Sequence, residues 1–472
     1  MQLPDDFLTG IRQQLDGNLV EALLKGLNQN PPVSVRLNPL KTKATLQDMP
    51  MAEVEVPWCR GGYYLKQRLN FTFDPLLHAG LYYVQEASSM FLDQVMRQYI
   101  GTLPVTMLDM CAAPGGKSTV ARAALPEGSL LFSNEPLRPR AQVLAENMQK
   151  FGHPDVIVTN NYAQDYAKSG IKFDVILTDV PCSGEGMFRK DPAAISEWSL
   201  QNVEKCWTLQ RDIVEALWNC LKPGGLLIYS TCTFNTKEDE LNVKHIAETF
   251  GAEVLTVNTE AKWHISGSQV ADFPKPVCRF IPGLSKGEGL FMAVLKKPGS
   301  SEPQAQKAKD KKARRNKTER NKANTIKPYM GWIKDADNYQ PVVNGTAVTA
   351  IPKAWKSVYD AAASTLKIMS AGIKMGEIKG KDIIPAQALA LSTALQRDAF
   401  TQVELNYSQA IAYLRKESIT LPAGTPRGYA LLCYRKHPIG FAKNIGNRAN
   451  NLYPNEWKIK SSHIPESNNE LF

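Results

Sequence analysis

The sequence lacks the features of membrane, secreted and zinc proteins. No apolar run approaches the roughly 18 residues that a membrane-spanning helix requires. Asp5 and Asp6 stand near the start, where a secretory signal would have basic residues followed by an apolar stretch. Histidine is scarce, with six residues, and the eight cysteines include no C-x-x-C pair. We therefore expect a cytoplasmic protein with free thiols, no metal centre and no membrane partner.

The positive charge is confined largely to one short segment. Residues 307–322 hold nine Lys or Arg against two acids, so they carry +7 of the net charge of +10. The surrounding stretch, 298–327, has almost no large apolar side chains. We expect a basic linker at 298–327 that contacts phosphate groups.

The central part of the chain alternates short apolar runs with segments long enough for helices. The runs are VTMLD, SLLFSN, VIVTN, FDVILTD and GLLIYSTC. This alternation predicts an α/β domain, a parallel sheet with helices on its faces. A later run, GLFMAVLKK at 289–297, is expected to add an edge strand that closes the domain. Because such sheets bind ligands at the carboxyl ends of their strands, the residues just after each run are the candidates for function.

Composition and pattern divide the whole chain into five parts. The last part contains GYALLCYRKHPIGFAKNIG at 428–446, which predicts a hairpin that turns at Lys436 to Ile439. The expected parts are an N-terminal α+β extension at 1–100, the α/β core at 101–297, the basic linker at 298–327, a weakly patterned connecting region at 328–385 and a compact, mostly-β module at 386–472.

The stretch MLDMCAAPGGKST, at 107–119, is similar to a phosphate-binding P-loop. That loop requires G-x-x-x-x-G-K-[ST], and Cys111 stands where the first glycine should be. A nucleoside cofactor is the better interpretation, because a turn of small residues lets a ligand approach the backbone. Ala112, Ala113, Gly115 and Gly116 supply such a turn. Glu135, after the next run, stands where an acid would bind ribose hydroxyls.

Two cysteines follow neighbouring apolar runs. Asp179 and Cys182 come after FDVILTD, and Cys232 ends GLLIYSTC. A thiolate at a strand end could attack an electrophilic carbon, and a nearby acid could stabilise the charge that develops. Cys206 and Cys220 fall in the intervening helical segment, where we expect them to be core residues.

These motifs together carry a family resemblance. DMCAAPGGKST, NEP, DVPCSGEGMFRKDP and KPGGLLIYSTCTFNTKEDE closely resemble the Nop/Sun family of RNA cytosine-C5 methyltransferases, which use S-adenosylmethionine. SVRLN, YVQEASSM and GEGLFMAVLKK extend the resemblance over about residues 30–297. The C-terminal hairpin with NLYPNEWKIK resembles the PUA-like RNA-binding module of the RsmF-type members. The resemblance therefore implies a Rossmann-like methyltransferase core and small-subunit ribosomal RNA, free or in the 30S particle, as partner.

The resemblance also implies a role for each strand-end residue. Cys232 of the TC motif would be the nucleophile, and Cys182 of the PC motif would release the adduct; spacing alone does not choose between them. Asp179 would bind the cytosine edge. Asp179 and Glu135 would border the cofactor together with one loop. The residues of that loop are Cys111, Ala112, Ala113, Pro114, Gly115, Gly116 and Lys117.

Two positions depart from the family pattern. Tyr162, with Asp165 nearby, stands where many members have an acid at the adenine end of the cofactor. Ser285 or Lys286 replaces a histidine that commonly precedes G-E-G.

Several other readings stay open. Transfer RNA is the alternative substrate, because the catalytic motifs are shared across RNA classes. A P-loop nucleotide hydrolase and a non-catalytic RNA-binding scaffold are less favoured, and DNA is not expected as a partner. We expect a monomer. Most of the aromatics in the last module, which are Tyr434, Phe441, Tyr453 and Trp457, are expected in its own core rather than stacked on bases.

Overall fold

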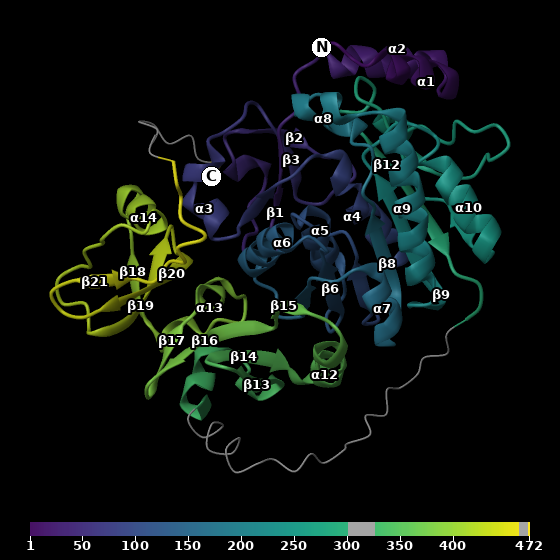
Figure 1. Ribbon diagram of the computed structural model, residues 1–472. Coiled ribbons are helices and arrows are strands. Elements are labelled where there is room, and N and C mark those ends of the chain that lie inside the picture. Colours follow the sequence, from purple (N-terminus) through teal and green to yellow (C-terminus); the bar gives the residue numbers. More distant parts are fainter. Residues whose placement is uncertain (301–325, 462–470) are drawn as a thin grey trace.

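The computed structural model describes residues 1–300, 326–461 and 471–472, and these fold around four β-sheets (Figure 1). Most of the expected basic linker, residues 301–325, lies outside the described part of the chain. Within the described ranges, no helix is long and apolar enough to cross a membrane.

The largest sheet forms the α/β core. Its strand order is β10-β12-β9-β8-β5-β6-β7-β15, with β11 paired to β12. Strands β5 to β9 are parallel to one another, which confirms the predicted parallel sheet with helices on its faces. The strands are β5 (Thr106–Asp109), β6 (Leu130–Asn134), β7 (Val156–Thr159), β8 (Phe173–Asp179), β9 (Leu221–Thr231), β10 (Glu253–Leu255), β11 (Cys278–Phe280), β12 (Leu290–Lys296) and β15 (Ile368–Ala371).

Helices cover both faces of this sheet because its central strands are apolar on both sides. Met107 and Leu108 are adjacent on β5, yet they join separate hydrophobic clusters. Met107 packs with Val120 and Leu144 of the helices on one face, and Leu108 packs with residues of the opposite face. The helices are α4 (Leu92–Tyr99), α5 (Gly116–Ala124), α6 (Arg138–Phe151), α7 (Ala163–Ser169), α8 (Pro192–Glu197), α9 (Leu200–Trp218) and α10 (Glu240–Phe250).

The expected edge strand lies inside the sheet instead. β12 pairs antiparallel with β9 on one side, and β10 and β11 pair with its other side. Its residues from Leu290 to Leu295 are all buried, which is the pattern of an interior strand with both faces covered. At the opposite end of the sheet, β15 from the connecting region pairs antiparallel with β7. Residues far along the chain therefore complete the core sheet at that end.

The N-terminal region supplies a small sheet and, ahead of it in the chain, the two helices α1 and α2. The sheet order is β2-β3-β1-β4. The two helices lie beside α8 in Figure 1, where Phe7 contacts Phe188 and Trp198 of the core at ring-centroid distances of 5.2 and 5.6 Å. The elements are α1 (Asp5–Gln14), α2 (Gly17–Leu27), β1 (Ser34–Leu37), β2 (Ala52–Glu55), β3 (Gly62–Leu65), α3 (Pro75–His78) and β4 (Tyr82–Val84), with 3-10 turns at Leu46–Asp48, Phe71–Phe73 and Ser88–Phe91.

The weakly patterned connecting region forms a sheet of its own. Its four strands are antiparallel, in the order β13-β14-β16-β17. Short strands with half-buried faces give little periodic signal, which is why the sequence showed no clear pattern here. The elements are β13 (Tyr339–Asn344), β14 (Ala347–Pro352), α12 (Lys356–Thr365), β16 (Ile373–Lys379) and β17 (Asp382–Pro385), and α13 (Gln387–Leu391) follows at the start of the last module.

The last module contains the predicted hairpin with a corrected turn. β19 (Gly428–Tyr434) and β20 (His437–Asn444) are joined by Arg435 and Lys436, whose φ angles are 46° and 66°. Two successive positive φ values match the twist of a tight hairpin, so the turn falls before Pro438 rather than at it. The other elements are β18 (Thr401–Glu404), which is parallel to β19, α14 (Tyr407–Leu414) and β21 (Ala449–Asn451).

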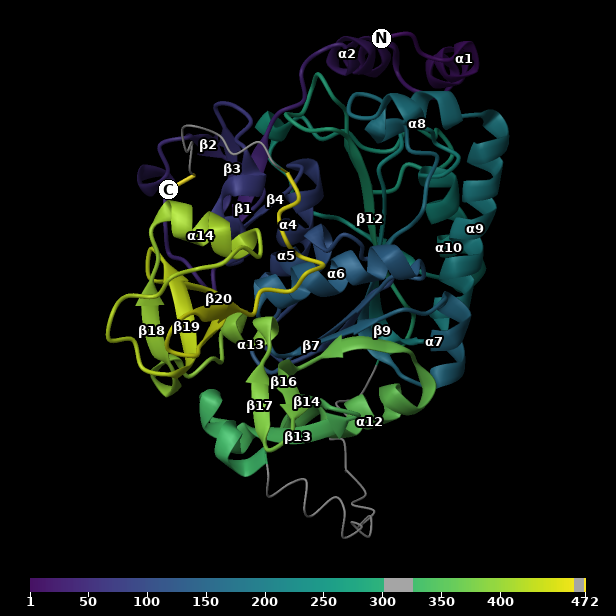
Figure 2. The ribbon, with the colours of Figure 1, turned by 60° about the vertical axis from the view of Figure 1, so that its left-hand side comes forward.

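The first and last parts of the chain share one hydrophobic core. Val35 and Tyr82 of the N-terminal sheet belong to the same cluster as Tyr413 and Tyr453 of the last module. Leu471, the residue before the last, is fully buried in this cluster, and Figure 2 shows α14 lying beside the N-terminal sheet. The C-terminal module is therefore packed against the rest of the molecule. Among the aromatics expected in its core, Tyr434, Phe441 and Tyr453 are buried, whereas Trp457 is half-buried.

Candidate active site

The two strand-end cysteines are in contact. β8 and β9 are parallel neighbours with Asp179 opposite Ser230, so the loops that follow them begin side by side. The sulfurs of Cys182 and Cys232 lie 3.3 Å apart, and both residues are half-buried. The bond to Cys232 and burial raise the pKa of Cys182 well above its ordinary value. Cys182 therefore keeps its proton near neutral pH.

The other two cysteines lie away from this pair. Cys206 is on α9 but is only half-buried, so the expectation that it is a core residue is wrong. It lies on an amphipathic helix whose outer side faces solvent. Cys220 is buried as expected, although it follows the end of α9 rather than lying within the helix.

A charged pair lies at the same edge of the sheet. Lys117 Nζ is 2.9 Å from Asp179 Oδ1, which also accepts a 2.8 Å hydrogen bond from the Ser230 hydroxyl. Burial opposes the charge of Lys117, but the carboxylate of Asp179 and the nearby Cys232 outweigh it and raise the lysine pKa. Lys117 thus carries a full positive charge between the cysteines and the loop before α5.

The loop 111–117 has the close geometry that its small residues allow. It runs from the end of β5 to the start of α5. Gly115 adopts a φ of 114°, which residues other than glycine rarely adopt. The Ala112 amide donates to the Asn134 carbonyl at 2.8 Å, and the Arg140 guanidinium donates to the Ala113 carbonyl at 2.9 Å. These bonds fix the loop against β6 and α6.

Glu135 follows β6, as the sequence predicted. Its side chain is 2% exposed, and one carboxylate oxygen accepts the Leu137 amide at 3.0 Å. The other carboxylate oxygen is 3.6 Å from Arg140. The carboxylate is therefore held rigidly at the carboxyl end of β6.

Asp109 is a site residue that the sequence interpretation missed. It ends β5 and is fully buried, with one carboxylate oxygen bonded to the Ser118 hydroxyl at 2.6 Å and the other without a partner. Burial raises its pKa to about 7, and the charge of Asp179 adds to this shift. An acid just before the small loop was the signal that could have identified it.

The residues around the loop fit S-adenosylmethionine. The small side chains of the loop leave its backbone accessible to a nucleoside, and Glu135 offers carboxylate oxygens at the carboxyl end of the next strand. The unpartnered oxygen of Asp109 is an acceptor that a donor group of the cofactor would satisfy. Across the part of the chain that the structure describes, no group of three or more His, Cys, Asp or Glu could hold a metal ion.

The departures from the family pattern have structural explanations. Tyr162 is 61% exposed, and Asp165 accepts its amide at 2.9 Å, so Asp165 caps α7. The neighbouring Asn161 instead binds the backbone of Lys367, just before β15, with the Lys367 amide donating to Asn161 Oδ1 at 3.0 Å. Ser285 is buried and donates to Ile281, and Lys286 forms an ion pair with Glu53.

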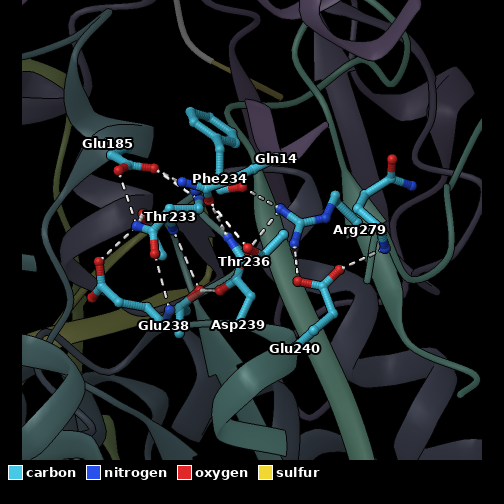
Figure 3. A network of polar contacts seen from close by, with 12 residues as sticks. Gln14, Glu185, Thr233, Phe234, Thr236, Glu238, Asp239, Glu240 and Arg279 are labelled. Carbon is cyan, nitrogen blue, oxygen red and sulfur yellow. Dashed lines mark hydrogen bonds and ion pairs between the residues drawn. The ribbon is translucent and has the colours of Figure 1, made fainter. Parts of the chain in front are cut away.

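Figure 3 shows the buried polar network that joins the loop after β9 to Glu185 and Arg279. Arg279 on β11 forms ion pairs with Asp239 at 3.0 Å and with Glu240 at 2.5 Å, and all three side chains are at most 1% exposed. Arg279 also donates to the Phe234 carbonyl at 2.7 Å. Arg279 therefore anchors the loop between β9 and α10, both through the loop's backbone and through the acids at its end.

Three family models match successive parts of the chain. The model of the N-terminal domain of 16S rRNA methyltransferase RsmF matches residues 3–87. The 16S rRNA methyltransferase RsmB/F model matches residues 104–296, and the methyltransferase RsmF PUA domain model matches residues 400–459.

Curated relatives match the chain over nearly its whole length. The ribosomal RNA small subunit methyltransferase F of Shewanella loihica is 28% identical over 97% of this chain and 95% of its own. The protein of the same name from Aliivibrio fischeri is 29% identical over 96% of this chain and 97% of its own.

Solved structures support the same fold. A methyltransferase homologue from Pyrococcus horikoshii is 24% identical, with a TM-score of 0.52 over 62% of this chain and all of its own. NSun6 from the same organism, solved with SFG, is 19% identical, with a TM-score of 0.52 over 63% of this chain and 99% of its own. The loop, the strand-end residues and the three matched domains lead to one conclusion: the chain belongs to the RsmB/F family of S-adenosylmethionine-dependent methyltransferases and has the domain organisation of RsmF.

Proposed function

We propose that this chain methylates carbon 5 of a cytosine in small-subunit (16S) ribosomal RNA through a covalent bond between Cys232 and the base. The observation that carries the proposal is the contact of the Cys182 and Cys232 sulfurs beside the Lys117–Asp179 pair. Two thiols at adjacent strand ends, next to a loop that fits the cofactor, are what a nucleophile and a release group require.

The cofactor would be held by the loop from Cys111 to Lys117, by Glu135 and by Asp109. Bound S-adenosylmethionine supplies an electrophilic methyl group on a sulfonium sulfur. Asp179 adjoins both this loop, through Lys117, and the cysteine pair, so it would border the cofactor and accept a hydrogen bond from the amino edge of the cytosine. The base would then lie between the methyl donor and the thiols.

Cys232 would begin the reaction. Carbon 5 of cytosine is a weak nucleophile, so the Cys232 thiolate first adds to carbon 6 and makes the ring an enamine that attacks the methyl carbon. The resemblance of the TC motif to the family gives this role to Cys232, whose sulfur lies against that of Cys182. Lys117, charged and close by, stabilises negative charge at this position.

Cys182 would complete the reaction. After methyl transfer, the proton on carbon 5 must leave so that the bond between carbon 6 and the Cys232 sulfur can break. Cys182 lies against that sulfur and would take part in this release. A variant without Cys182 should therefore stop at the covalent stage.

The substrate and setting follow from the relatives and the fold. The names of the family models and curated relatives specify small-subunit ribosomal RNA, and the matched PUA domain supports RNA as the partner. A cytosine inside a helix cannot reach the cysteines, so the target would be looped or flipped out. We propose a cytoplasmic monomer that acts on the RNA or on the 30S particle, without DNA or membrane partners.

Two substitutions and three RNA pools test the proposal. Labelled methyl from S-adenosylmethionine is offered with 30S particles, naked 16S RNA and transfer RNA, followed by nucleoside analysis. We expect 5-methylcytidine in a ribosomal pool, no product with Cys232→Ala, and a covalent protein–RNA adduct on denaturing gels with Cys182→Ala. Label confined to transfer RNA would reject the substrate, and normal turnover by Cys232→Ala would reject the nucleophile.

A further inference from the structure

The two cysteine loops are joined by a reciprocal pair of buried carboxylates. Glu185, in the loop after β8, accepts the amides of Phe234 and Asn235 in the loop after β9, at 2.7 and 3.1 Å. Glu238, in the loop after β9, accepts the amide of Ser183 in the loop after β8 at 3.0 Å. Each loop thus contributes an acid that holds the backbone of the other. We call Glu185 and Glu238 the carboxylate clamp.

The contacts of the clamp lie beside the reactive cysteines. Ser183 directly follows Cys182, and Phe234 is two residues after Cys232. The Gly186 amide, next to Glu185, donates to the Cys232 carbonyl at 2.7 Å. A shift of either acid would therefore displace the backbone that carries a thiol.

Carboxylates suit the clamp because both acids act as acceptors in every side-chain hydrogen bond that they make among the described residues. Besides the backbone amides, Glu185 accepts from the Trp198 indole at 3.1 Å, and Glu238 accepts from Gln210 at 2.8 Å. The Asn235 amide donates to both acids, at 3.0 and 2.8 Å. An ionised carboxylate only accepts, whereas a glutamine would place its own N–H groups against these donors.

Stability alone does not explain the clamp. Both acids are at most 1% exposed, and burial together with the charge of Glu185 raises the pKa of Glu238 to about 7. A carboxyl group whose pKa is raised from its ordinary 4.5 to about 7 costs the folded state free energy as the pH rises from 4.5, and the cost is complete once the pH has passed about 7. Two acids that share one amide in the interior are therefore retained at a cost, for the geometry that they impose.

We propose that Glu185 and Glu238 are positioning residues that hold Cys182 and Cys232 in contact and thereby set the rate of the covalent step. The inference rests on the proposed function for its kinetic part only. Its geometric part, the contact between the two sulfurs, can be measured without RNA.

The test compares Glu185→Gln and Glu238→Gln with the unaltered chain. Diamide oxidises two thiols to a disulfide and is itself reduced to the hydrazine, so the rate at which Cys182 and Cys232 become linked reports their approach from 3.3 Å to bonding distance, about 2.05 Å. The linked peptide is quantified by mass spectrometry after digestion. Methyl transfer kcat and S-adenosylmethionine affinity are measured in parallel.

We expect each clamp variant to form the Cys182–Cys232 disulfide at least tenfold more slowly and to lose at least tenfold in kcat, with cofactor affinity within twofold. Asn235→Ser, which removes the shared amide but no backbone donor, should show a smaller loss of the same kind and serves if a glutamine variant does not fold. Asp93→Asn is the matched control, because Asp93 is also a buried carboxylate that accepts a backbone amide, from Arg60 at 3.1 Å.

Clamp variants that form the disulfide as fast as the unaltered chain would overturn the proposal, as would an unaltered chain that forms no such disulfide. Equal slowing in Asp93→Asn would also overturn it, since any loss of a buried acid would then suffice. If the unaltered chain transfers methyl to none of the RNA pools while the variants still slow disulfide formation, the proposed function fails and the clamp stands.

Discussion

Asp109 and Lys117 are both buried at the carboxyl end of the sheet, but their raised pKa values have opposite effects on charge. The shift favours the neutral form of Asp109 and the charged form of Lys117. Lys117 is paired with Asp179, which offsets the cost of burying the ammonium group. Asp109 has only the Ser118 hydroxyl, so burial dominates and its pKa rises to about 7. Whether each of these buried groups is charged near neutral pH therefore depends on whether it has a partner of opposite charge.

Asp109→Asn should make the free energy of unfolding less sensitive to pH. A carboxyl with an ordinary pKa of 3.8 and a folded-state pKa of about 7 contributes stability below pH 3.8, and this contribution is lost as the pH rises through about 7. Between pH 6 and 8.5, the unaltered chain should therefore lose on the order of 1–2 kcal/mol relative to the variant. Thermal or urea unfolding at several pH values measures this difference. Parallel curves for the two proteins would contradict it.

Gly186 shows how an element constrains the site. The loop after β8 passes so close to the loop after β9 that a Cβ on Gly186 would lie 2.3 Å from the Cys232 carbonyl oxygen. This approach allows the Gly186 amide to reach that oxygen. In the G-E-G stretch at 184–186, the packing of the two loops therefore explains the second glycine, and the acid between the glycines joins the loops.

Gly186→Ala should separate the two loops. Inserting a methyl group into this contact should cost about 1–3 kcal/mol of stability. Because the Cys232 backbone would have to shift, kcat should fall at least tenfold while cofactor affinity is retained. Gly267→Ala is the control, because a Cβ there meets nothing within 4 Å. Unfolding midpoints and methyl-transfer rates measured for both variants decide the matter, and equal behaviour would refute the steric argument.

The whole molecule is more integrated than a core with an attached RNA-binding arm. The last module shares a hydrophobic core with the N-terminal sheet, so removing it would expose that core. The connecting region contributes β15 to the core sheet and binds Asn161 beside Asn134, whose side chain donates to the Asn161 carbonyl at 2.8 Å. Asn160 in turn donates to the Glu135 carbonyl at 2.8 Å. The cofactor end of the sheet is therefore supported by residues some 200 positions away.

Asn161→Ala should weaken cofactor binding, although the sequence interpretation did not single out Asn161. The change removes the bonds to Lys367 and with them the support for the segment beside Glu135, so S-adenosylmethionine affinity should fall several-fold, as expected for one or two hydrogen bonds. Calorimetric titration measures this effect. Thr393→Val is the control, because it breaks a bond between the segment after α13 and Gly152, away from the cofactor loop. An equal loss of affinity in both variants would point to general loosening.

The predictable part of this protein is local. Short, mainly apolar runs identified β5 to β9, because strands that are buried on both faces need apolar side chains at most positions. The small loop, Glu135, Asp179 and the two cysteines were found because chemistry at a parallel sheet occurs where strands end.

What only the tertiary structure decided depends on partners distant in the chain. The burial of Asp109, the clamp of Glu185 and Glu238, and the bond from Asn161 to Lys367 each require knowing which backbone or charge lies opposite a side chain. The interior place of β12 and the shared core of the first and last modules have the same origin. Residue type and spacing determine what an element can bury, whereas pKa values and loop geometry follow from the neighbours that the fold brings to it.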